Sequence, residues 1–289
     1  MSLSSCHSSW TPNHETNQER LVRLFGCENP VAWITGSAAD RVGRQIAKHF
    51  FSRGYRVVIH ARHSIQEGVQ GVEQLCDLRP NHAMLVTGAI EEDNFAERAI
   101  GEIKAKFERL DVLVNSAAIW DPVPLEQITA KELRRNFDAN TIGSFLCAQQ
   151  AGLLMVSQSH GGAIINIGDW ASERPYSGFA SYFPSKGSIP SLTKCMAVEL
   201  SQRNPRIRVS AVLPGPVMIP NEMTPEARRD LLKQCLLQRE GTAQDVAEAA
   251  LFLAEAPFIT GVCLAVDGGR TLFGTQSTDA TAHPSHWID

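Results

Sequence analysis

Short apolar runs rich in β-branched residues alternate along this chain with helical patterns, and this alternation is the feature that most constrains the fold. The runs lie at residues 31–35, 56–60, 83–87, 111–115, 163–167 and 208–213, and a last one is expected within residues 260–269. Helical patterns such as NFAERAIGEIKAKF separate them. Near-continuous apolar strands joined by helices are typical of a parallel sheet covered on both faces. The sequence therefore predicts an α/β fold with a doubly wound parallel sheet of about seven strands and helices on both faces.

The two ends of the chain are polar and differ from the middle. We expect a flexible N-terminal extension over residues 1–29, one domain over residues 30–273 and a polar C-terminal tail over residues 274–289. The start of the chain lacks the apolar stretch of a secretory signal peptide. The seven cysteines are scattered without metal-ligand spacing, as is typical of reduced thiols. These features predict a cytoplasmic protein without a metal site.

Charge and hydropathy argue against two classes of partner. The net charge of −4 gives no electrostatic basis for binding nucleic acid or an anionic membrane. No apolar run approaches the roughly 18 residues that a membrane span requires. The expected partner is therefore a small molecule.

A glycine-containing turn follows the first expected strand. Gly36 and Gly43 lie in TGSAADRVGRQIA, between the run at 31–35 and a helical pattern. Glycine lets the backbone turn tightly and approach a pyrophosphate, which the N-terminus of the following helix attracts. Glycines alone are weak evidence, but their place between strand and helix makes this turn a candidate dinucleotide site.

Basic residues follow the second expected strand. An NAD site usually has an acidic residue there, which binds the ribose hydroxyls. This chain instead has His60, Arg62 and Ser64, and Arg41 lies in the glycine-containing turn. Guanidinium groups and a hydroxyl suit a 2′-phosphate. NADP(H) is therefore the expected cofactor, and a solvated basic turn is the alternative.

Tyr182 and Lys186 are four residues apart, so both can face one pocket from a helix. A tyrosine of ordinary pKa is a poor acid–base catalyst near neutral pH. A nearby ammonium group stabilises the phenolate, and we expect Lys186 to lower the pKa of Tyr182 for proton transfer. The spacing is common by itself and gains meaning beside a cofactor turn.

Taken together, these motifs resemble those of the short-chain dehydrogenases/reductases over about residues 30–273. The matching stretches are the turn at 35–43, NSA at 115–117, Asn140, Tyr182 with Lys186, PG at 214–215 and VDGG at 266–269. The resemblance implies a single-domain Rossmann-type fold and a homo-oligomer, commonly a tetramer, formed through helices near residues 130–155 and 183–203. It also implies that Lys186 contacts the nicotinamide ribose and that Asn140 holds a proton-relay water. The cofactor-binding residues that it implies are Gly36, Ser37, Arg41, Val42, Gly43, His60, Arg62, Ser64, Asn115, Ala117, Tyr182, Lys186, Pro214 and Gly215.

Asp169 departs from the general family pattern, which has serine at this place. A carboxylate opposes the negative charge that develops on oxygen during carbonyl reduction. Asp169 therefore either impairs that reaction or indicates a different one, and simple capping of a strand-end turn is a further explanation. Pteridine reductases and dihydromonapterin reductases, a subgroup of the family, resemble this chain in having Asp there. The subgroup pattern also matches Arg41 and the spacing of His60 and Ser64.

Trp120 lies in NSAAIWDPVPL, where the subgroup has a phenylalanine that stacks on the pterin. An indole offers a larger π face to a flat ring, although a partly exposed loop aromatic is the alternative. The subgroup resemblance thus implies a pterin-like substrate bound by Trp120, Asp169 and Tyr182. The catalytic residues that it implies are Asp169, Tyr182, Lys186 and Asn140.

Three departures bear on the geometry of the site. The glycine-containing turn is one residue longer than is usual in the family. The family's adenine-contacting Asp is absent from residues 86–93, where Gly88 or Ala89 stands. Pro184 and Pro190 fall within the expected helix of Tyr182 and Lys186. Because proline is tolerated in a first helical turn but kinks a helix interior, this helix is expected to start late or to bend.

Three functions stay open on the sequence. The first is NADPH-dependent reduction of a pterin or dihydropterin-like ring, with Tyr182 and Asp169 assisting protonation. The second is reduction of another carbonyl, quinone or imine. The third is a non-catalytic NADP(H)-binding sensor, against which the intact Tyr182, Lys186 and Asn140 argue.

Overall fold

The computed structural model describes residues 15–220 and 222–272. Within these ranges, seven parallel strands form one sheet in the order β3-β2-β1-β4-β5-β6-β7. All of the predicted apolar runs are strands, which confirms the predicted sheet. The strands are β1 (Val31–Ile34), β2 (Arg56–Ala61), β3 (Ala83–Thr87), β4 (Val112–Asn115), β5 (Gly162–Ile167), β6 (Ile207–Pro214) and β7 (Cys263–Val266).

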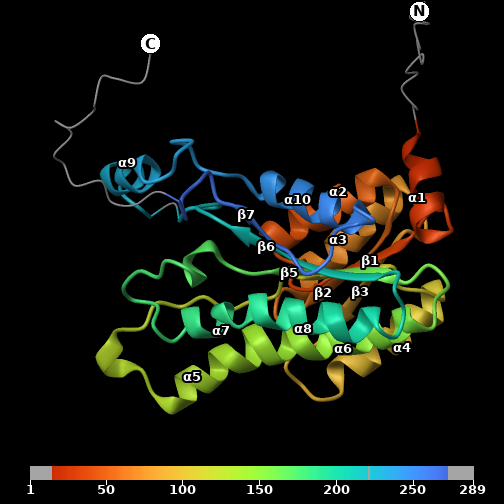
Figure 1. Cartoon of the computed structure of the whole chain (residues 1–289), viewed down its shortest axis with the longest axis horizontal. Helices are drawn as coiled ribbons and strands as arrows, with labels where there is room; N and C mark the ends of the chain where they lie inside the picture. The colour runs from red at the N-terminus through yellow and green to blue at the C-terminus, as the bar shows by residue number, and fades with distance from the viewer. Residues whose placement is uncertain (1–14, 221, 273–289) are drawn as a thin grey trace, which may run out of the picture.

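Helices cover both faces of the sheet (Figure 1). One face carries α1 (Asn17–Phe25), α2 (Val42–Arg53), α3 (Ile65–Leu78) and α10 (Ala243–Glu255). The other carries α4 (Phe95–Phe107), α6 (Gly143–Val156) and α8 (Ile189–Ser201). The shorter helices are α5 (Ala130–Phe137), α7 (Phe183–Gly187) and α9 (Pro225–Lys233). Among the described helices, none combines the length and apolar character that crossing a membrane requires.

The position of the site follows from the place of β1 in the sheet. β1 lies between β2 and β4, so the two halves of the chain run outward from its two sides. In sheets of this kind, ligands bind outside the carboxyl ends of the strands where the order reverses. Gly36 makes the turn after β1 with φ +63°, and a Cβ there would lie 2.6 Å from the Cα of Ala117, beyond β4. The two turns therefore meet backbone to backbone, and only glycine fits.

The N-terminal part of the chain differs from the expected flexible extension. Residues 17–25 form α1, which Thr16 and Glu19 cap reciprocally. Leu21 and Phe25, one turn apart, are 1% and 2% exposed in the core. This apolar pair was hidden in a stretch of polar composition, so the prediction for 1–29 was wrong over the helix. The rest of that prediction, over residues 1–14, and the expected tail over residues 274–289 lie outside the described residues.

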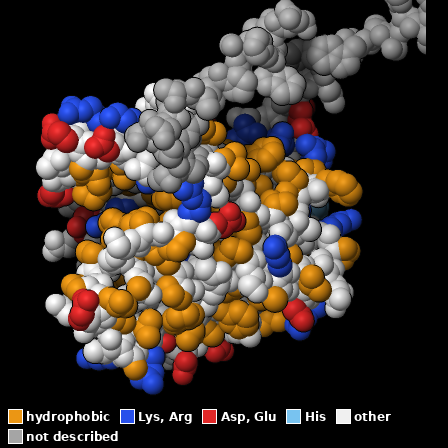
Figure 2. Space-filling view, turned by 60° about the vertical axis from the view of Figure 1, so that its left-hand side comes forward, with side chains coloured by type: hydrophobic (Ala, Val, Ile, Leu, Met, Phe, Trp, Pro, Cys, Tyr) orange, Lys and Arg blue, Asp and Glu red, His pale blue; other side chains and the backbone are white. Residues whose placement is uncertain are grey.

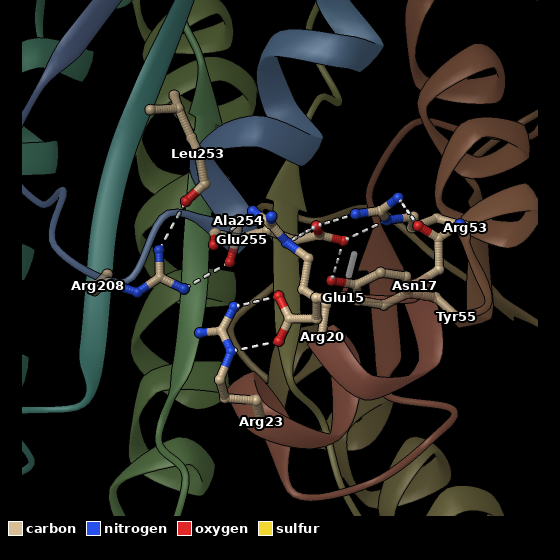
Figure 3. Close-up of polar contacts among 10 residues, drawn as sticks. All are labelled: Glu15, Asn17, Arg20, Arg23, Arg53, Tyr55, Arg208, Leu253, Ala254 and Glu255. Carbon is tan, nitrogen blue, oxygen red and sulfur yellow. Dashed lines mark hydrogen bonds and ion pairs between the residues drawn. The ribbon is translucent and has the colours of Figure 1, made fainter. Parts of the chain in front are cut away.

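A buried carboxylate fastens α1 to the domain. Glu255, at the end of α10, is 2% exposed. Arg53 from α2 donates to it through Nε at 3.0 Å and Nη2 at 2.8 Å, and Arg20 from α1 approaches at 2.8 Å (Figure 3). The Tyr55 hydroxyl also donates to it, at 3.4 Å. Two cations and a hydroxyl thus balance one buried charge, which would otherwise be costly.

We expect Glu255→Ala to lower the free energy of unfolding by about 2–4 kcal/mol, because two arginines lose their shared counter-ion and a cavity remains. Urea unfolding monitored by circular dichroism measures this change. Arg23→Ala is the matched control on α1. It breaks the exposed pair of Arg23 with Glu15, which lies just before the helix (Figure 3), and should shift the midpoint of unfolding little. Equal shifts in the two variants would contradict the anchoring role of Glu255.

Candidate active site

A cleft of about 1690 Å³ runs along the carboxyl edge of the sheet. It joins the turn after β1, the loop after β2, the segment after β4 and the segment after β6. The predicted site residues that line it are Gly36, Arg41, Val42, His60, Arg62, Ser64, Ala117, Trp120, Asp169, Tyr182, Pro214 and Gly215. The other predicted residues, Ser37, Gly43, Asn115, Asn140 and Lys186, are all buried.

Asp169 and Tyr182 are in direct contact within this cleft. The Tyr182 hydroxyl donates to Asp169 Oδ2 at 2.9 Å. Asp169 Oδ1 accepts the backbone N–H of Ala171 at 2.8 Å and so caps the short 3₁₀ helix Trp170–Ser172. The carboxylate therefore caps a strand-end turn with one oxygen and holds the tyrosine with the other. Capping alone does not account for its position.

The two prolines divide the expected helix in two. α7 (Phe183–Gly187) has Pro184 in its first turn, and α8 (Ile189–Ser201) has Pro190 in its first turn. The helix thus begins late, directly after Tyr182, and is interrupted at Ser188, which is where proline is tolerated. Lys186 is 4% exposed, and its Nζ donates to the Ile167 carbonyl at the end of β5 at 2.7 Å.

Burial dominates the electrostatics of this group. Burial raises the pKa of Asp169, although hydrogen bonds from Ala171 and Tyr182 oppose the rise. Burial lowers the pKa of Lys186 to about 8, and the charge of Asp169 opposes this fall. Burial and then Asp169 hold the pKa of Tyr182 well above its usual value. The expectation that Lys186 lowers the pKa of Tyr182 was therefore wrong for this state, since the anionic neighbour has the larger effect.

Asn140 lies in one turn of π-helix (Asp138–Ile142) between α5 and α6. Its Oδ1 accepts the N–H of Ile119 at 2.9 Å, and its Nδ2 donates to the Ile119 carbonyl at 3.2 Å and to Ser185 Oγ at 3.0 Å. Asn140 thus ties the segment after β4 to α7. π-Bulges of this kind are frequent at functional sites. The proton-relay water implied for Asn140 stays a prediction.

His60 and Ser37 hold the glycine-containing turn and leave no side-chain donor for a cofactor. His60 Nδ1 accepts the Gly36 N–H at 2.8 Å, and its Nε2 faces the Gly88 carbonyl at 2.9 Å. The Ser37 hydroxyl donates to Ile34 O at 2.7 Å and accepts the His60 N–H at 3.1 Å. Burial lowers the pKa of His60, which favours the neutral ring that this bonding requires. His60 and Ser37 were expected among the cofactor-binding residues, and in this structure their side chains bond to the backbone of the turn instead.

Asn115 and Gly43 support the cleft from within the core. Asn115 Nδ2 donates to Ser144 O and to Asn166 Oδ1, both at 3.0 Å, and so links β4 to α6 and β5. A Cβ on Gly43 would lie 2.5 Å from the Gly36 carbonyl oxygen, so this glycine lets α2 pack closely on the turn. Both residues shape the cleft from behind.

Arg62 and Glu91 form an ion pair of 2.6 Å in the cleft. Sequence reasoning found Arg62 but missed Glu91, because the pair joins the loops after β2 and β3. Glu91 Oε2 is buried and without a hydrogen-bond partner in the described residues, so Arg62 balances the charge of Glu91.

Arg41 is exposed at the start of α2, and Ser64 precedes α3 without capping it.

An aromatic cluster lines the other end of the cleft. Trp120, 44% exposed, stacks on Phe179 with ring centres 4.9 Å apart and 7° between planes. Tyr176 packs edge-on against Phe179, and Trp170 stacks on Tyr176. One face of Trp120 is therefore covered by Phe179, which sequence reasoning missed although aromatic residues crowd 170–183.

The turn after β1, the loop after β2 and Tyr182 meet in one cleft, and comparison with known proteins decides the family. Residues 36–271 match the family described as enoyl-(acyl carrier protein) reductase. The chain is a member of the short-chain dehydrogenase/reductase family. It is 34% identical over 232 residues to the 3-oxoacyl-[acyl-carrier-protein] reductase of Bos taurus, with 80% of this chain and 94% of that protein covered.

The similarity extends over nearly the whole length of two further proteins. A ketoacyl reductase assigned to granaticin polyketide synthesis in Streptomyces violaceoruber is 31% identical, covering 85% of this chain and 97% of that protein. A crystal structure of a proposed gluconate dehydrogenase from Agrobacterium tumefaciens superposes with a TM-score of 0.77 at 26% identity, covering 86% of this chain and 97% of that one. These similarities establish an oxidoreductase of this family and do not confirm the pteridine reductase subgroup.

The family's dinucleotide is NAD(P)(H), and the residues present fit it. Gly36 lines the cleft without a side chain, and Arg41 and Val42 at the start of α2 line it as well, so this backbone forms a candidate dinucleotide cradle that a pyrophosphate can approach. Arg44 in α2 is 8% exposed and donates to the carbonyl oxygens of Ala38 and Glu67, which fixes the turn from behind.

Proposed function

We propose that this short-chain dehydrogenase/reductase reduces a carbonyl group with NADP(H) as hydride donor. The observation that carries the proposal is the contact of Tyr182 with Asp169, beside Lys186, in the cleft that also contains the dinucleotide cradle. The ketoacyl reductases among the relatives support a carbonyl substrate over a pterin. The bound cofactor supplies a hydride to the carbonyl carbon.

Asp169 has to be protonated for this reaction. While Asp169 is ionised, it accepts a hydrogen bond from the Tyr182 hydroxyl and repels the negative charge that develops on the substrate oxygen. Burial raises its pKa, so the neutral carboxyl group persists to higher pH than in an ordinary aspartate. Once neutral, Asp169 acts as a donor, and the Tyr182 hydroxyl is released to protonate the substrate oxygen. The product is the alcohol.

Lys186 and Asn140 support the proton transfer from behind. A pKa of about 8 leaves the Lys186 ammonium mostly charged at neutral pH, where it balances charge that forms on Tyr182. Asn140 fixes the backbone on which Tyr182 and Ile119 sit, through Ser185 and Ile119. We propose that Lys186 also contacts the ribose of the cofactor.

A flat nitrogen heterocycle of the pterin type is the second candidate substrate. Asp169 favours it, because an ionised carboxylate accepts ring N–H donors. Trp120 supports it with its face opposite Phe179. A protein that binds NADPH tightly and reduces neither class would instead be a sensor.

Asp169→Ser distinguishes the two substrates. We expect it to raise kcat for neutral ketones by roughly tenfold or more above neutral pH, because a hydroxyl donor replaces a repelling charge. Wild-type ketone reduction should fall as pH rises through the raised pKa of Asp169, since the acid form is the active one, and the variant should lack this fall. NADPH oxidation with ketones, biopterin and dihydrofolate, followed across pH, measures both effects.

The control for this experiment is Asp121→Ser. Asp121 lines the same cleft but pairs with Arg135 at 2.8 Å, so its loss should leave the pH profile unchanged. Ketone turnover that does not respond to Asp169→Ser, together with lost pterin turnover, would favour the second candidate.

For the cofactor, we propose NADP(H) held through Arg41, Arg62 and Ser64. These three residues supply two guanidinium groups and a hydroxyl at the cleft. The carboxylate of Glu91 competes with a 2′-phosphate for Arg62 and repels it. Glu91 thus limits the preference for NADPH over NADH.

Glu91→Gln should tighten NADPH binding by roughly three- to tenfold while NADH binding changes little, because Arg62 then has no competing partner. Isothermal titration calorimetry with both dinucleotides measures the ratio. Glu92→Gln, which removes the exposed neighbouring charge, is the control. A ratio that is the same in both variants and the wild type would overturn this role of Glu91.

We propose that the protein forms a homo-oligomer, a tetramer, through α6 and α8. Residues 143–156 of α6 contain no charged side chain. Phe145 and Leu153 on α6 are 41% and 45% exposed, and Val198 on α8 is 56% exposed. Figure 2 shows many exposed hydrophobic side chains on the lower half of the molecule, the level at which α6 and α8 lie in Figure 1. Such surfaces are typical of subunit contacts.

Phe145→Glu should therefore convert the tetramer into smaller species, because a charge at the centre of an apolar contact is costly. Size-exclusion chromatography with light scattering gives the mass directly. Leu78→Glu replaces an exposed residue at the end of α3, on the opposite face of the sheet, and should leave the mass unchanged. A monomeric wild-type protein would refute the proposal.

A further inference from the structure

Arg270 is a buried cation in the wall of the cleft. It follows Gly268 and Gly269, whose φ values of +62° and +79° turn the chain sharply after β7. Its side chain is only 9% exposed, yet it lines the same cleft as Asp169 and Tyr182. The sequence motifs gave no role to this residue.

The side-chain contacts of Arg270 are neutral, and its backbone carbonyl accepts a hydrogen bond from the Arg174 guanidinium at 2.9 Å. Arg270 Nη1 donates to the Leu231 carbonyl of α9 at 2.9 Å, and its guanidinium lies over Trp170, 4.7 Å from the ring centre. The Cys235 thiol is a further neighbour. Its Nε is buried without a hydrogen-bond partner. Among the residues that the structure describes, no carboxylate forms an ion pair with Arg270.

The acidic residue nearest to Arg270 in the sequence, Asp267, does not serve as its counter-ion. Asp267 accepts the N–H of Gly269 at 2.9 Å and both the N–H and the hydroxyl of Thr271 at 2.7 Å. Its oxygens therefore stabilise the turn that carries Arg270. The cation–π contact with Trp170 offsets part of the desolvation cost of the guanidinium but does not neutralise its charge.

Three other arginines of the cleft have acidic partners, and a fourth, Arg41, is exposed to solvent. Arg135 pairs with Asp121 at 2.8 Å, Arg62 pairs with Glu91 at 2.6 Å, and Arg228 pairs with Glu240. All three are considerably more exposed than Arg270. Among the cleft arginines, Arg270 is the one that is deeply buried, and no described carboxylate pairs with it, although burial is what makes an unpaired charge costly.

Arg270 lies close to the reacting pair. Trp170, which it covers, directly follows Asp169 in the chain. Burial is the main cause that raises the pKa of Tyr176, and Asp169 adds to this rise while Arg270 opposes it. Both charges therefore act on one phenol in the cleft.

We propose that Arg270 forms an anion subsite that binds the carboxylate of a small oxo-acid substrate. This inference rests on the proposed carbonyl reduction. The carboxylate supplies the counter-charge that the described residues do not provide, and a guanidinium binds it with charge-assisted hydrogen bonds. The oxo group of the same molecule then lies at Tyr182 and Asp169. The bond between Arg270 and the substrate carboxylate therefore selects an acidic substrate and orients its oxo group toward Tyr182.

Binding and turnover test the subsite separately. Binding of benzoate and of neutral benzamide to the full chain, with and without NADP⁺, is measured by calorimetry at fixed ionic strength. Turnover of 4-acetylbenzoate is compared with that of its methyl ester. We expect the wild type to prefer the carboxylate by about tenfold or more in both measurements. A wild type that binds benzoate no better than benzamide overturns the subsite, whether or not any ketone is reduced.

Variants then assign the preference to Arg270. Arg270→Gln should abolish the preference for the acid over the ester, whereas Arg270→Lys should retain part of it. Arg135→Gln is the matched control, because it removes a cleft arginine that already has a partner. An equal loss for acid and ester in Arg270→Gln would indicate a structural role only. Absence of NADPH oxidation with preserved benzoate selectivity would refute the proposed reduction and leave the subsite standing.

Discussion

The site depends on the contact between the turns that follow β1 and β4. The Thr35 hydroxyl accepts the N–H groups of Ser116 and Ala117, both at 3.0 Å, and Thr35 is fully buried. Gly36 then passes so close to Ala117 that no side chain fits between them. This junction fixes the one place where the two halves of the sheet diverge, and it sets the distance between the dinucleotide cradle and the reacting residues.

Local patterns were sufficient for the sheet because each strand is a short apolar run, and the central strands β1, β4 and β5 are buried throughout. They were not sufficient for the direction of individual side chains. His60 and Ser37 have residue types that suit phosphate, yet both bond to the backbone of the turn. Nothing in a single strand tells whether a polar side chain at its end faces inward or into the cleft.

The electrostatic features of the site arise from contacts between distant segments. Glu91 meets Arg62 across two loops, and Arg270 reaches the cleft from the end of the domain. The effect of Asp169 on Tyr182 outweighs that of Lys186 because Asp169 touches the hydroxyl, whereas Lys186 bonds to Ile167. Spacing along the chain placed Asp169, Tyr182 and Lys186 in one region but could not rank their interactions, and it did not indicate Glu91 or Arg270.

The interruption between α7 and α8 has a consequence for the site. Pro190 has no N–H to continue the hydrogen-bond ladder from α7, so Tyr182 and Lys186 belong to a rigid unit of their own. Asn140 and Asp169 hold that unit to the rest of the site. The position of Tyr182 and Lys186 therefore depends on these side-chain contacts and not on an unbroken helix continuing into α8.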